Sequence, residues 1–395
     1  MIYLDHYRTT PVSEAVVSKM APFFRDDFFL PEPFTKRGTK AEEIIEQANR
    51  TLLDTFHLKT GEVMYTSGGT AANNIVISGV LRDVEPSQAH AVCAVIDHPS
   101  IVHTYEYYRK KGVSVTFLKV DDDGWIDPEE LRRSIQPKTL LVSFTHVNHT
   151  IGVIQPLEQL LPIIKERNPN TRIHIDAAVS LNAMDLDLTK LPIDFLTFSG
   201  HKIYGPKGIG AVVFRNNGLL KPTLFGSVTT SPFTPGAENI PGIVGLAEAL
   251  RLAAEKRATY RLKTRRLQER AINLIESDIP DVVLNGPKPT SFGNLDAIPT
   301  QRAVDNINFS FRYVEGESIM LFLDFEDIVV ATGSACASSD LKVNYVLSAI
   351  GRDHEMAHGS LRITPGWDND EEQIDRFVDR LKPIVSRLRA QSTLR

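Results

Sequence analysis

One lysine lies in a setting that suits covalent chemistry. Lys202 sits within residues 199–208, SGHKIYGPKG, directly after the apolar run Phe195–Phe198. That run predicts a buried strand, so it brings the lysine to the end of a sheet. A lysine amine among small and polar groups can form a Schiff base with an aldehyde, and Ser199 and His201 offer donors for a phosphate.

A carboxylate upstream complements this lysine. Asp176 ends the alternating segment His174–Asp176 and is followed by small residues. A carboxylate there can pair with a pyridinium nitrogen and keep the ring protonated, so that the ring accepts electrons. Lys202 alone could equally be a solvated surface lysine. Lysine, phosphate donors and carboxylate together indicate pyridoxal 5'-phosphate as the cofactor.

Composition limits the class of protein. The chain of 395 residues is too long for one small hydrophobic core, so its length suggests two or three domains. The chain is 42% hydrophobic and 24% charged, as in soluble globular proteins, and its net charge of -5 argues against a nucleic-acid partner.

Cysteine usage and the start of the chain bear on location. The two cysteines, Cys93 and Cys336, give no disulfide framework, and Cys93 falls in an apolar run expected to be core. The segment Met1–His6 lacks the pattern of a signal peptide, and no apolar run reaches membrane-spanning length. We expect a cytoplasmic protein with no membrane partner.

Strand-like and helical patterns alternate through the first two thirds, which predicts a mostly parallel sheet between helices. Helices are expected at Ala41–Phe56 and Thr70–Leu81. The expected strands are Val63–Tyr65, Ala91–Ile96, Val113–Leu118, Thr139–Phe144, Arg172–Ile175, Phe195–Phe198 and Gly210–Phe214.

The last third predicts a smaller α/β unit. A long helical pattern over Pro241–Ser277 suits a connector, and Asn285–Gln301 is loop-like. Expected next are strands at Asn306–Phe311, Ile328–Ala331 and Leu361–Ile363, with helices at Glu317–Asp324, Asn344–Ile350 and Glu371–Arg389. We expect a large cofactor-binding domain over 15–250, and a small domain over 1–14 and 251–395.

Eight short segments, in this order along the chain, resemble the cysteine desulfurases of the class V aminotransferase group. The resemblance extends from Ile2 to about Leu388. The segments are Leu4-Asp5 with Thr9-Thr10-Pro11, Thr66-Ser67-Gly68-Gly69-Thr70, His98, His146-Val147-Asn148, Asp176, Ser199-Gly200-His201-Lys202, Gly333-Ser334-Ala335-Cys336 and Ser360-Leu361-Arg362.

The resemblance implies an aspartate-aminotransferase-like fold and a homodimer. It implies a pyridoxal phosphate enzyme that removes sulfur from L-cysteine, releases L-alanine and carries the sulfur as a persulfide on Cys336. That cysteine lies in a run of small residues, in a loop that can move. The sulfur would pass to an acceptor protein, such as an iron–sulfur scaffold.

The resemblance also assigns roles to single residues. Catalytic roles fall to Lys202, Cys336 and His98. Of these, His98 would stack on the cofactor ring. Arg362 would hold the substrate carboxylate, with Asn148 and Arg8 as further substrate-binding candidates. The cofactor set is Gly69, Thr70, His98, Asn148, Asp176, Ser199, His201 and Lys202, and no metal is expected. Independently, Gly68-Gly69-Thr70 follows a strand and opens a helix, which suits an anion.

Several positions depart from the family pattern. Val179 replaces a glutamine that bonds the ring oxygen, and valine cannot donate a hydrogen bond. Arg8 stands where a small residue is expected, and Leu30–Phe34 replaces an Asn-Pro-small-Ser segment. The loop over 225–237 lacks the usual arginine, and Ala237 replaces a threonine.

These departures leave two alternatives open. One is another pyridoxal phosphate enzyme of the same fold, such as a selenocysteine lyase or an aminotransferase, in which Arg8 reads an extra carboxylate. The other is a sulfur-carrier or scaffold protein with little activity, which the altered 225–237 loop and Val179 favour. The acceptor and the pathway stay open.

Overall fold

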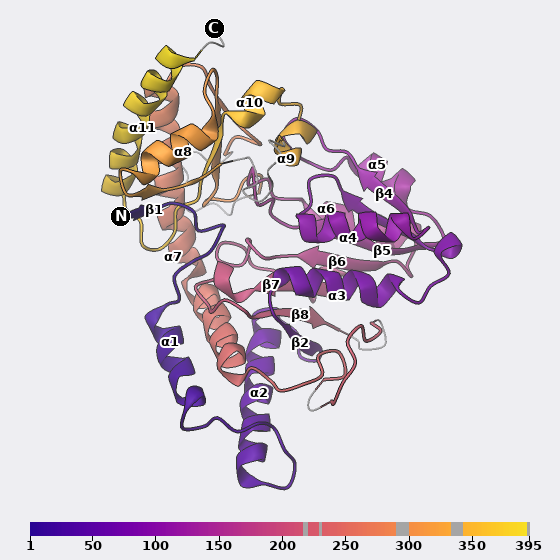
Figure 1. Cartoon of the computed structure of the whole chain (residues 1–395). Helices are drawn as coiled ribbons and strands as arrows, with labels where there is room; N and C mark the ends of the chain where they lie inside the picture. The colour runs from indigo at the N-terminus through magenta and orange to yellow at the C-terminus, as the bar shows by residue number, and fades with distance from the viewer. Residues whose placement is uncertain (216–219, 229–230, 290–299, 333–342, 393–395) are drawn as a thin grey trace.

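The computed structural model describes residues 1–215, 220–228, 231–289, 300–332 and 343–392. A seven-stranded sheet forms the larger body, in the order β2-β8-β7-β6-β5-β3-β4 (Figure 1). Its strands are β2 (Glu62–Thr66), β3 (His90–Ala94), β4 (Ser114–Leu118), β5 (Thr139–Thr145), β6 (Arg172–Asp176), β7 (Phe195–Ser199) and β8 (Gly210–Phe214). β8 runs antiparallel to both of its neighbours, whereas β7, β6, β5, β3 and β4 are parallel. All seven expected strands are confirmed.

Side chains that point alternately to the two faces of the large sheet form two separate hydrophobic cores. In β3, Ala91 and Cys93 pack on one face of the sheet, while Val92 and Ala94 pack on the other. Successive side chains of a strand point to opposite faces, so a strand covered on both sides must be apolar throughout. This explains why strands such as β3, β7 and β8 are mostly apolar along their whole length.

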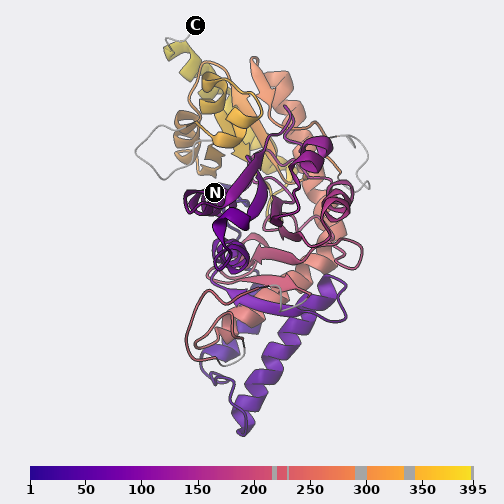
Figure 2. The same cartoon turned by 90° about the vertical axis from the view of Figure 1, so that its right-hand side faces the viewer.

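Helices cover both faces of this sheet. α3 (Gly69–Leu81) and α4 (Pro99–Lys110) pack on one face, and apolar residues of the remaining large-body helices join the core on the other. Those helices are α1 (Glu14–Met20), α2 (Lys36–Thr55), α5 (Pro128–Ser134), α6 (Leu157–Arg167) and the first part of α7 (Ile240–Asp278). Short 3₁₀ turns occur at Ala21–Phe24, Pro86–Gln88 and Gly200–Lys202. Both views show α2 extending away from the body (Figures 1 and 2).

The smaller unit contains a four-stranded sheet in the order β12-β13-β10-β9. Its core is formed with α8 (Gly316–Asp324), α11 (Glu371–Gln391) and the C-terminal part of α7. The strands are β9 (Val282–Leu284), β10 (Ile307–Phe311), β12 (Ala331–Thr332) and β13 (Ser360–Ile363), and the short helices are α9 (Tyr345–Ala349) and α10 (His354–His358). Long α7 therefore contributes to both cores, as expected of the connector.

One expected strand is corrected. The segment Ile328–Ala331 is not continuous, because β11 (Ile328–Val329) pairs with β1 (Ile2–Tyr3), while β12 pairs with β13. The chain thus changes sheets at Val330. Nothing in four consecutive apolar residues encodes this change, since it depends on the N-terminal strand, more than 300 residues away.

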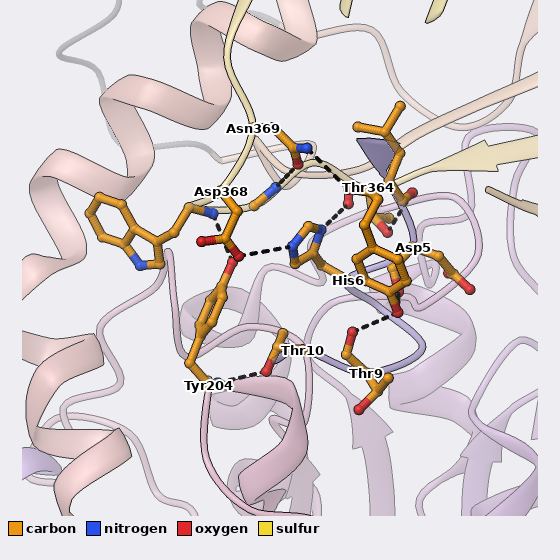
Figure 3. A network of polar contacts seen from close by, with 12 residues as sticks. Asp5, His6, Thr9, Thr10, Tyr204, Thr364, Asp368 and Asn369 are labelled. Carbon is orange, nitrogen blue, oxygen red and sulfur yellow. Dashed lines mark hydrogen bonds and ion pairs between the residues drawn. The ribbon is translucent and has the colours of Figure 1, made fainter. Parts of the chain in front are cut away.

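The N-terminal segment links the smaller unit to the loop that bears Lys202. Tyr7 N–H donates to the hydroxyl of Thr364, which follows β13, at 3.1 Å. Thr10 N–H donates to the carbonyl of His201 at 2.8 Å, and Tyr204 N–H donates to the Thr10 hydroxyl at 2.8 Å. Figure 3 shows the contact between Tyr204 and Thr10, together with His6, which lies between Thr364 and Asp368.

Tyr204 adopts an unfavourable backbone conformation within this network. Its φ is 61°, in the left-handed region that non-glycine residues rarely occupy. The backbone bond to Thr10 and a bond from Trp367 N–H to the Tyr204 hydroxyl, at 2.8 Å, hold it there. Such a conformation costs about 1–3 kcal/mol and persists only where its surroundings enforce it.

Within the described ranges, no helix is both long and apolar enough to cross a membrane.

The buried hydroxyl of Thr10 is expected to matter for stability. In Thr10→Val, the Tyr204 N–H loses its acceptor and the carbonyl of His201 loses one donor, so the free energy of unfolding should fall by about 1–3 kcal/mol. Urea unfolding measures this difference. Thr51→Val, which removes a hydroxyl from the exposed face of α2, is the control. Equal stability of the two variants would contradict a structural role for Thr10.

Candidate active site

A cavity of about 730 Å³ lies at the carboxyl ends of the parallel strands. Its lining includes Thr145 at the end of β5, Asp176 at the end of β6, and Ser199 at the end of β7. Open parallel sheets bind their ligands at this edge, because the turns that follow several strands converge there. The N-terminal segment and Arg362 of β13 close the cavity from the side of the smaller unit.

Lys202 is held by backbone carbonyls of the N-terminal segment. Its Nζ donates to the carbonyl of Arg8 at 2.9 Å and also to that of Tyr7. Burial, followed by the positive charge of Arg362, lowers the pKa of Lys202 from 10.5 to about 8. Near physiological pH, the neutral and nucleophilic fraction of this amine is therefore far larger than that of an exposed lysine.

Arg362 is fixed by a buried ion pair. Its Nη2 donates to Asp5 Oδ1 at 2.7 Å and its Nη1 donates to the carbonyl of His149 at 2.9 Å. The Asp5 side chain is 2% exposed. Arg362 Nε is buried and makes no hydrogen bond within the described residues. The guanidinium thus faces the cavity from a fixed position, as recognition of a planar carboxylate requires.

A hydrogen-bonded chain connects Asp176 to His98. Asn73 Nδ2 donates to Asp176 Oδ2 at 2.7 Å and to Ser100 Oγ at 2.9 Å. His98 Nδ1 accepts from Ser100 N–H at 3.2 Å and lies 2.7 Å from the Ser100 hydroxyl. Because Nδ1 is an acceptor, neutral His98 carries its proton on Nε2. Burial lowers the pKa of His98, which favours this neutral form.

Ser199 faces the start of α3 and forms an anion cradle with it. The Ser199 hydroxyl is buried and has no hydrogen-bond partner within the described residues. A Cβ placed on Gly68 would lie 3.8 Å from this hydroxyl, and one on Gly69 would lie 3.6 Å from Ser199 Cβ. Gly68 caps α3 with a φ of 147°, and no side chain bonds the free N–H groups of the first turn. Free N–H groups and an unpaired hydroxyl suit a phosphate.

A family model described as "Aminotransferase class-V" matches residues 2–377. The chain belongs to the class V aminotransferase family. The cysteine desulfurase IscS of Dictyoglomus turgidum is 35% identical over 391 residues, which cover 99% of this chain and 96% of the relative. The cysteine desulfurase IscS 1 of Archaeoglobus fulgidus is 36% identical over 394 residues, which cover 100% of this chain and 99% of the relative.

Solved structures give the same relationship. A structure titled "NifS-like protein" matches with a TM-score of 0.88 at 27% identity, covering 98% of this chain and 99% of that chain. DndA from Streptomyces lividans matches with a TM-score of 0.75 at 30% identity, covering 90% and 97%. The predicted family, the aspartate-aminotransferase-like fold and the relationship to cysteine desulfurases are confirmed.

The cofactor of this class V enzyme is pyridoxal phosphate, and the cavity fits it. The unpaired Ser199 hydroxyl and the start of α3 would hold the phosphate, Asp176 the ring nitrogen, and Lys202 the aldehyde carbon. All of these groups line the same cavity, and the Ser199 hydroxyl has no partner among the described residues. Within the described residues, no group of three or more His, Cys, Asp or Glu side chains could hold a metal ion.

Most of the residues expected from the sequence line this one cavity. They are Arg8, Gly69, Thr70, His98, Asp176, Ser199, His201, Lys202 and Arg362. Val179 also lines it, at the position where the family has a glutamine. Cys336 lies outside the described residues.

Asn148 is the exception, and the expectation that it meets the cofactor or substrate requires correction. Its Nδ2 donates to the carbonyl of Ile96 at 2.8 Å, and its Oδ1 accepts from the N–H groups of Thr150 and Ile151. The neighbouring His149 lines the cavity instead, edge-on to His98 with 5.1 Å between ring centroids. Asn148 shapes the turn, and His149 is the side chain that the turn presents.

Sequence reasoning also missed Asn73, which bonds Asp176 from α3. The Asn73-Asn74 pair, directly before the apolar run Ile75–Ile77, was a usable signal, because buried polar groups require partners. For Asn148, the signal was its place before a turn that ends at Gly152, whose φ is 72°. Asparagine commonly bonds the backbone of the two or three residues that follow it.

The described part of the altered 225–237 loop lies beside the phosphate end of the cavity. Thr234, Pro235 and Ala237 line a neighbouring pocket of about 380 Å³, which shares Ser67 and Gly208 with the active site. Substitutions in this loop are therefore placed to change how the phosphate is held.

The lowered pKa of Lys202 predicts how cofactor loading depends on pH. Only the neutral amine attacks the aldehyde, so the rate at which apoprotein combines with pyridoxal phosphate should rise as pH passes about 8, rather than near 10.5. Stopped-flow absorbance gives this rate. In Arg362→Met, loss of a neighbouring cation should move the inflection to higher pH. An inflection near 10.5 in the unaltered protein would contradict the assignment.

Substitutions of Asn148 and His149 are expected to affect different properties of the protein. Asn148→Ala leaves two N–H groups without their acceptor, so it should lower the thermal unfolding midpoint of the apoprotein. His149→Ala removes a side chain whose Nδ1 has no hydrogen-bond partner among the described residues, so it should change the visible absorption of the bound cofactor with a smaller loss of stability. Calorimetry and absorbance spectra measure both quantities. The same pattern in both variants would contradict the distinction.

Proposed function

We propose that this chain is a pyridoxal phosphate-dependent cysteine desulfurase. It removes sulfur from L-cysteine, releases L-alanine and carries the sulfur as a persulfide on Cys336. The observation that carries the proposal is the placement of Lys202, Asp176 and Arg362 around one cavity in a chain similar throughout to cysteine desulfurases. When bound, pyridoxal phosphate supplies an electrophilic carbon for the substrate amine and a ring that accepts electrons from Cα.

The residues of the chain position and deprotonate the substrate. Arg362, held by Asp5, binds the α-carboxylate and sets the orientation of Cα. With substrate bound, Lys202 Nζ would be placed to remove the Cα proton and to return it. Its pKa of about 8 suits this exchange, because the group can be both base and acid near neutral pH.

His98 provides a second proton-transfer atom. With Nδ1 engaged by Ser100, its Nε2–H can donate to a developing negative charge and then be restored. The Asn73 bridge from Asp176 keeps the imidazole and the carboxylate in fixed relation. In the proposal, the Cys336 thiolate then attacks the substrate sulfur, and the Cβ–S bond breaks as the S–S bond forms.

The partners belong to the proposal. The acceptor is a protein that receives persulfide sulfur, such as an iron–sulfur scaffold, and the enzyme acts as a homodimer in the cytoplasm. The exposed aromatic side chains of Phe24, Phe28 and Phe34, at 63%, 62% and 101%, support a protein partner for the surface that leads into α2.

A second candidate has the same fold and cofactor but a different amino-acid substrate. It is favoured by Arg8, whose side chain brings an additional positive charge to the cavity. The carrier or scaffold alternative has less support, because Lys202, Asp176, His98 and Arg362 keep an arrangement suited to catalysis.

A single-turnover reaction with L-cysteine tests the proposal. The holoenzyme should release alanine and add the mass of one sulfur atom to the peptide that contains Cys336, because that thiol is the acceptor. Mass spectrometry and amino-acid analysis measure both products. Cys336→Ser should lose both, whereas Cys93→Ala, a change in the core of the sheet, should retain both. Visible cofactor absorption without either product would overturn the desulfurase assignment.

A further inference from the structure

Two arginine side chains lie near enough to the amine of Lys202 for their charges to act on it. Arg362 and Arg8 both line the cavity, and the charges of both lower the pKa of Lys202. The Lys202 amine also donates to the backbone carbonyl of Arg8 at 2.9 Å. A ligand whose amine takes the place of the lysine amine is therefore under the influence of both cations.

The two arginines differ in how they are held. Arg362 is 15% exposed and engaged by Asp5 and by the carbonyl of His149. Arg8 is exposed, and within the described residues its guanidinium makes no hydrogen bond or ion pair. Arg362 is a fixed and neutralised donor, whereas Arg8 is free to adjust to a ligand.

The carboxylates around the cavity are already bound to groups other than Arg8. Asp5 is paired with Arg362. Asp176 accepts from Asn73 and from the N–H of Ala178, at the ring-nitrogen position. Lys207 also lines the cavity, close enough to His201 to lower the pKa of that imidazole, so it would serve as the cation for the cofactor phosphate. Arg8 is the lining cation for which an anion on the substrate itself is the remaining partner.

We propose that Arg8 is a specificity-determining residue that binds an anionic group on the β-carbon of the amino-acid substrate. The proposal rests on the proposed function, in which this group is the thiolate of L-cysteine. The α-carboxylate, which every amino acid carries, goes to the fixed Arg362. The side chain, attached to the same Cα, extends to Arg8. The amine, the carboxylate and the side chain of the substrate are then bound at three separate places, which selects both the stereochemistry and the side-chain charge.

Binding measurements test this assignment without requiring turnover. L-aspartate carries a carboxylate on its β-carbon and L-alanine carries no group there, so holoenzyme should bind aspartate more tightly, by about tenfold to a hundredfold. Titration of the visible cofactor absorption measures both dissociation constants. Arg8→Gln should bring their ratio close to one, and Arg8→Lys should keep part of the preference.

Arg50→Gln, a change on the exposed face of α2, is the matched control and should keep the full ratio. A ratio near one in the unaltered enzyme, or an unchanged ratio in Arg8→Gln, would overturn the proposal. Both outcomes can be read even if Arg8→Gln turns over no substrate, because they rest on binding alone.

Kinetics with L-cysteine then show whether the anionic group that Arg8 binds is a thiolate or a carboxylate. If the thiolate is bound, Arg8→Gln should lower kcat/KM for L-cysteine about tenfold or more, with Arg8→Lys intermediate. A lost aspartate preference with unchanged kcat/KM would instead assign Arg8 to a carboxylate substrate. Failure of the proposed function looks different: the unaltered enzyme releases no alanine from L-cysteine, whatever the aspartate-to-alanine ratio.

Discussion

The ion pair between Asp5 and Arg362 is the contact on which the active site depends. It joins the N-terminal segment to β13, and Arg362 also binds the carbonyl of His149 in the larger body. Removal of one partner of such a buried pair costs about 3–5 kcal/mol, because the other charge is left without compensation. The pair therefore fixes the smaller unit, the N-terminal segment and the large sheet in one geometry around the cavity.

The reactivity of Lys202 follows from that geometry. The segment that Asp5 anchors supplies the carbonyls of Tyr7 and Arg8 to the lysine amine, and the same ion pair places Arg362 close enough to lower its pKa. Carbonyl oxygens orient the amine, while burial and neighbouring cations disfavour its charged form. Positioning and activation thus arise from the same contacts, so a disturbance of the N-terminal segment affects both.

The sequence predicted helices and strands correctly where the local pattern of apolar residues determines them. Apolar runs such as Phe195–Phe198 became strands because they are buried on both faces, and the helical pattern over Pro241–Ser277 became α7. The prediction was wrong for Ile328–Ala331, where two different partner strands divide an apolar run. Antiparallel β8 was likewise not foreseen, because strand direction depends on connections and not on residue type.

The sequence by itself determined the chemistry of the site: one lysine, its carboxylate, the anion-binding turn and the arginine, since residue types and their order along the chain define which reactions are available. Only the tertiary structure decided which side chains reach the cavity. It turned Asn148 inward, where it bonds the carbonyl of Ile96 and two local N–H groups, and it placed His149 in the lining of the cavity. It also brought Arg8, Lys202 and Arg362 to one cavity, because three segments that lie far apart in the sequence converge only when both cores are formed.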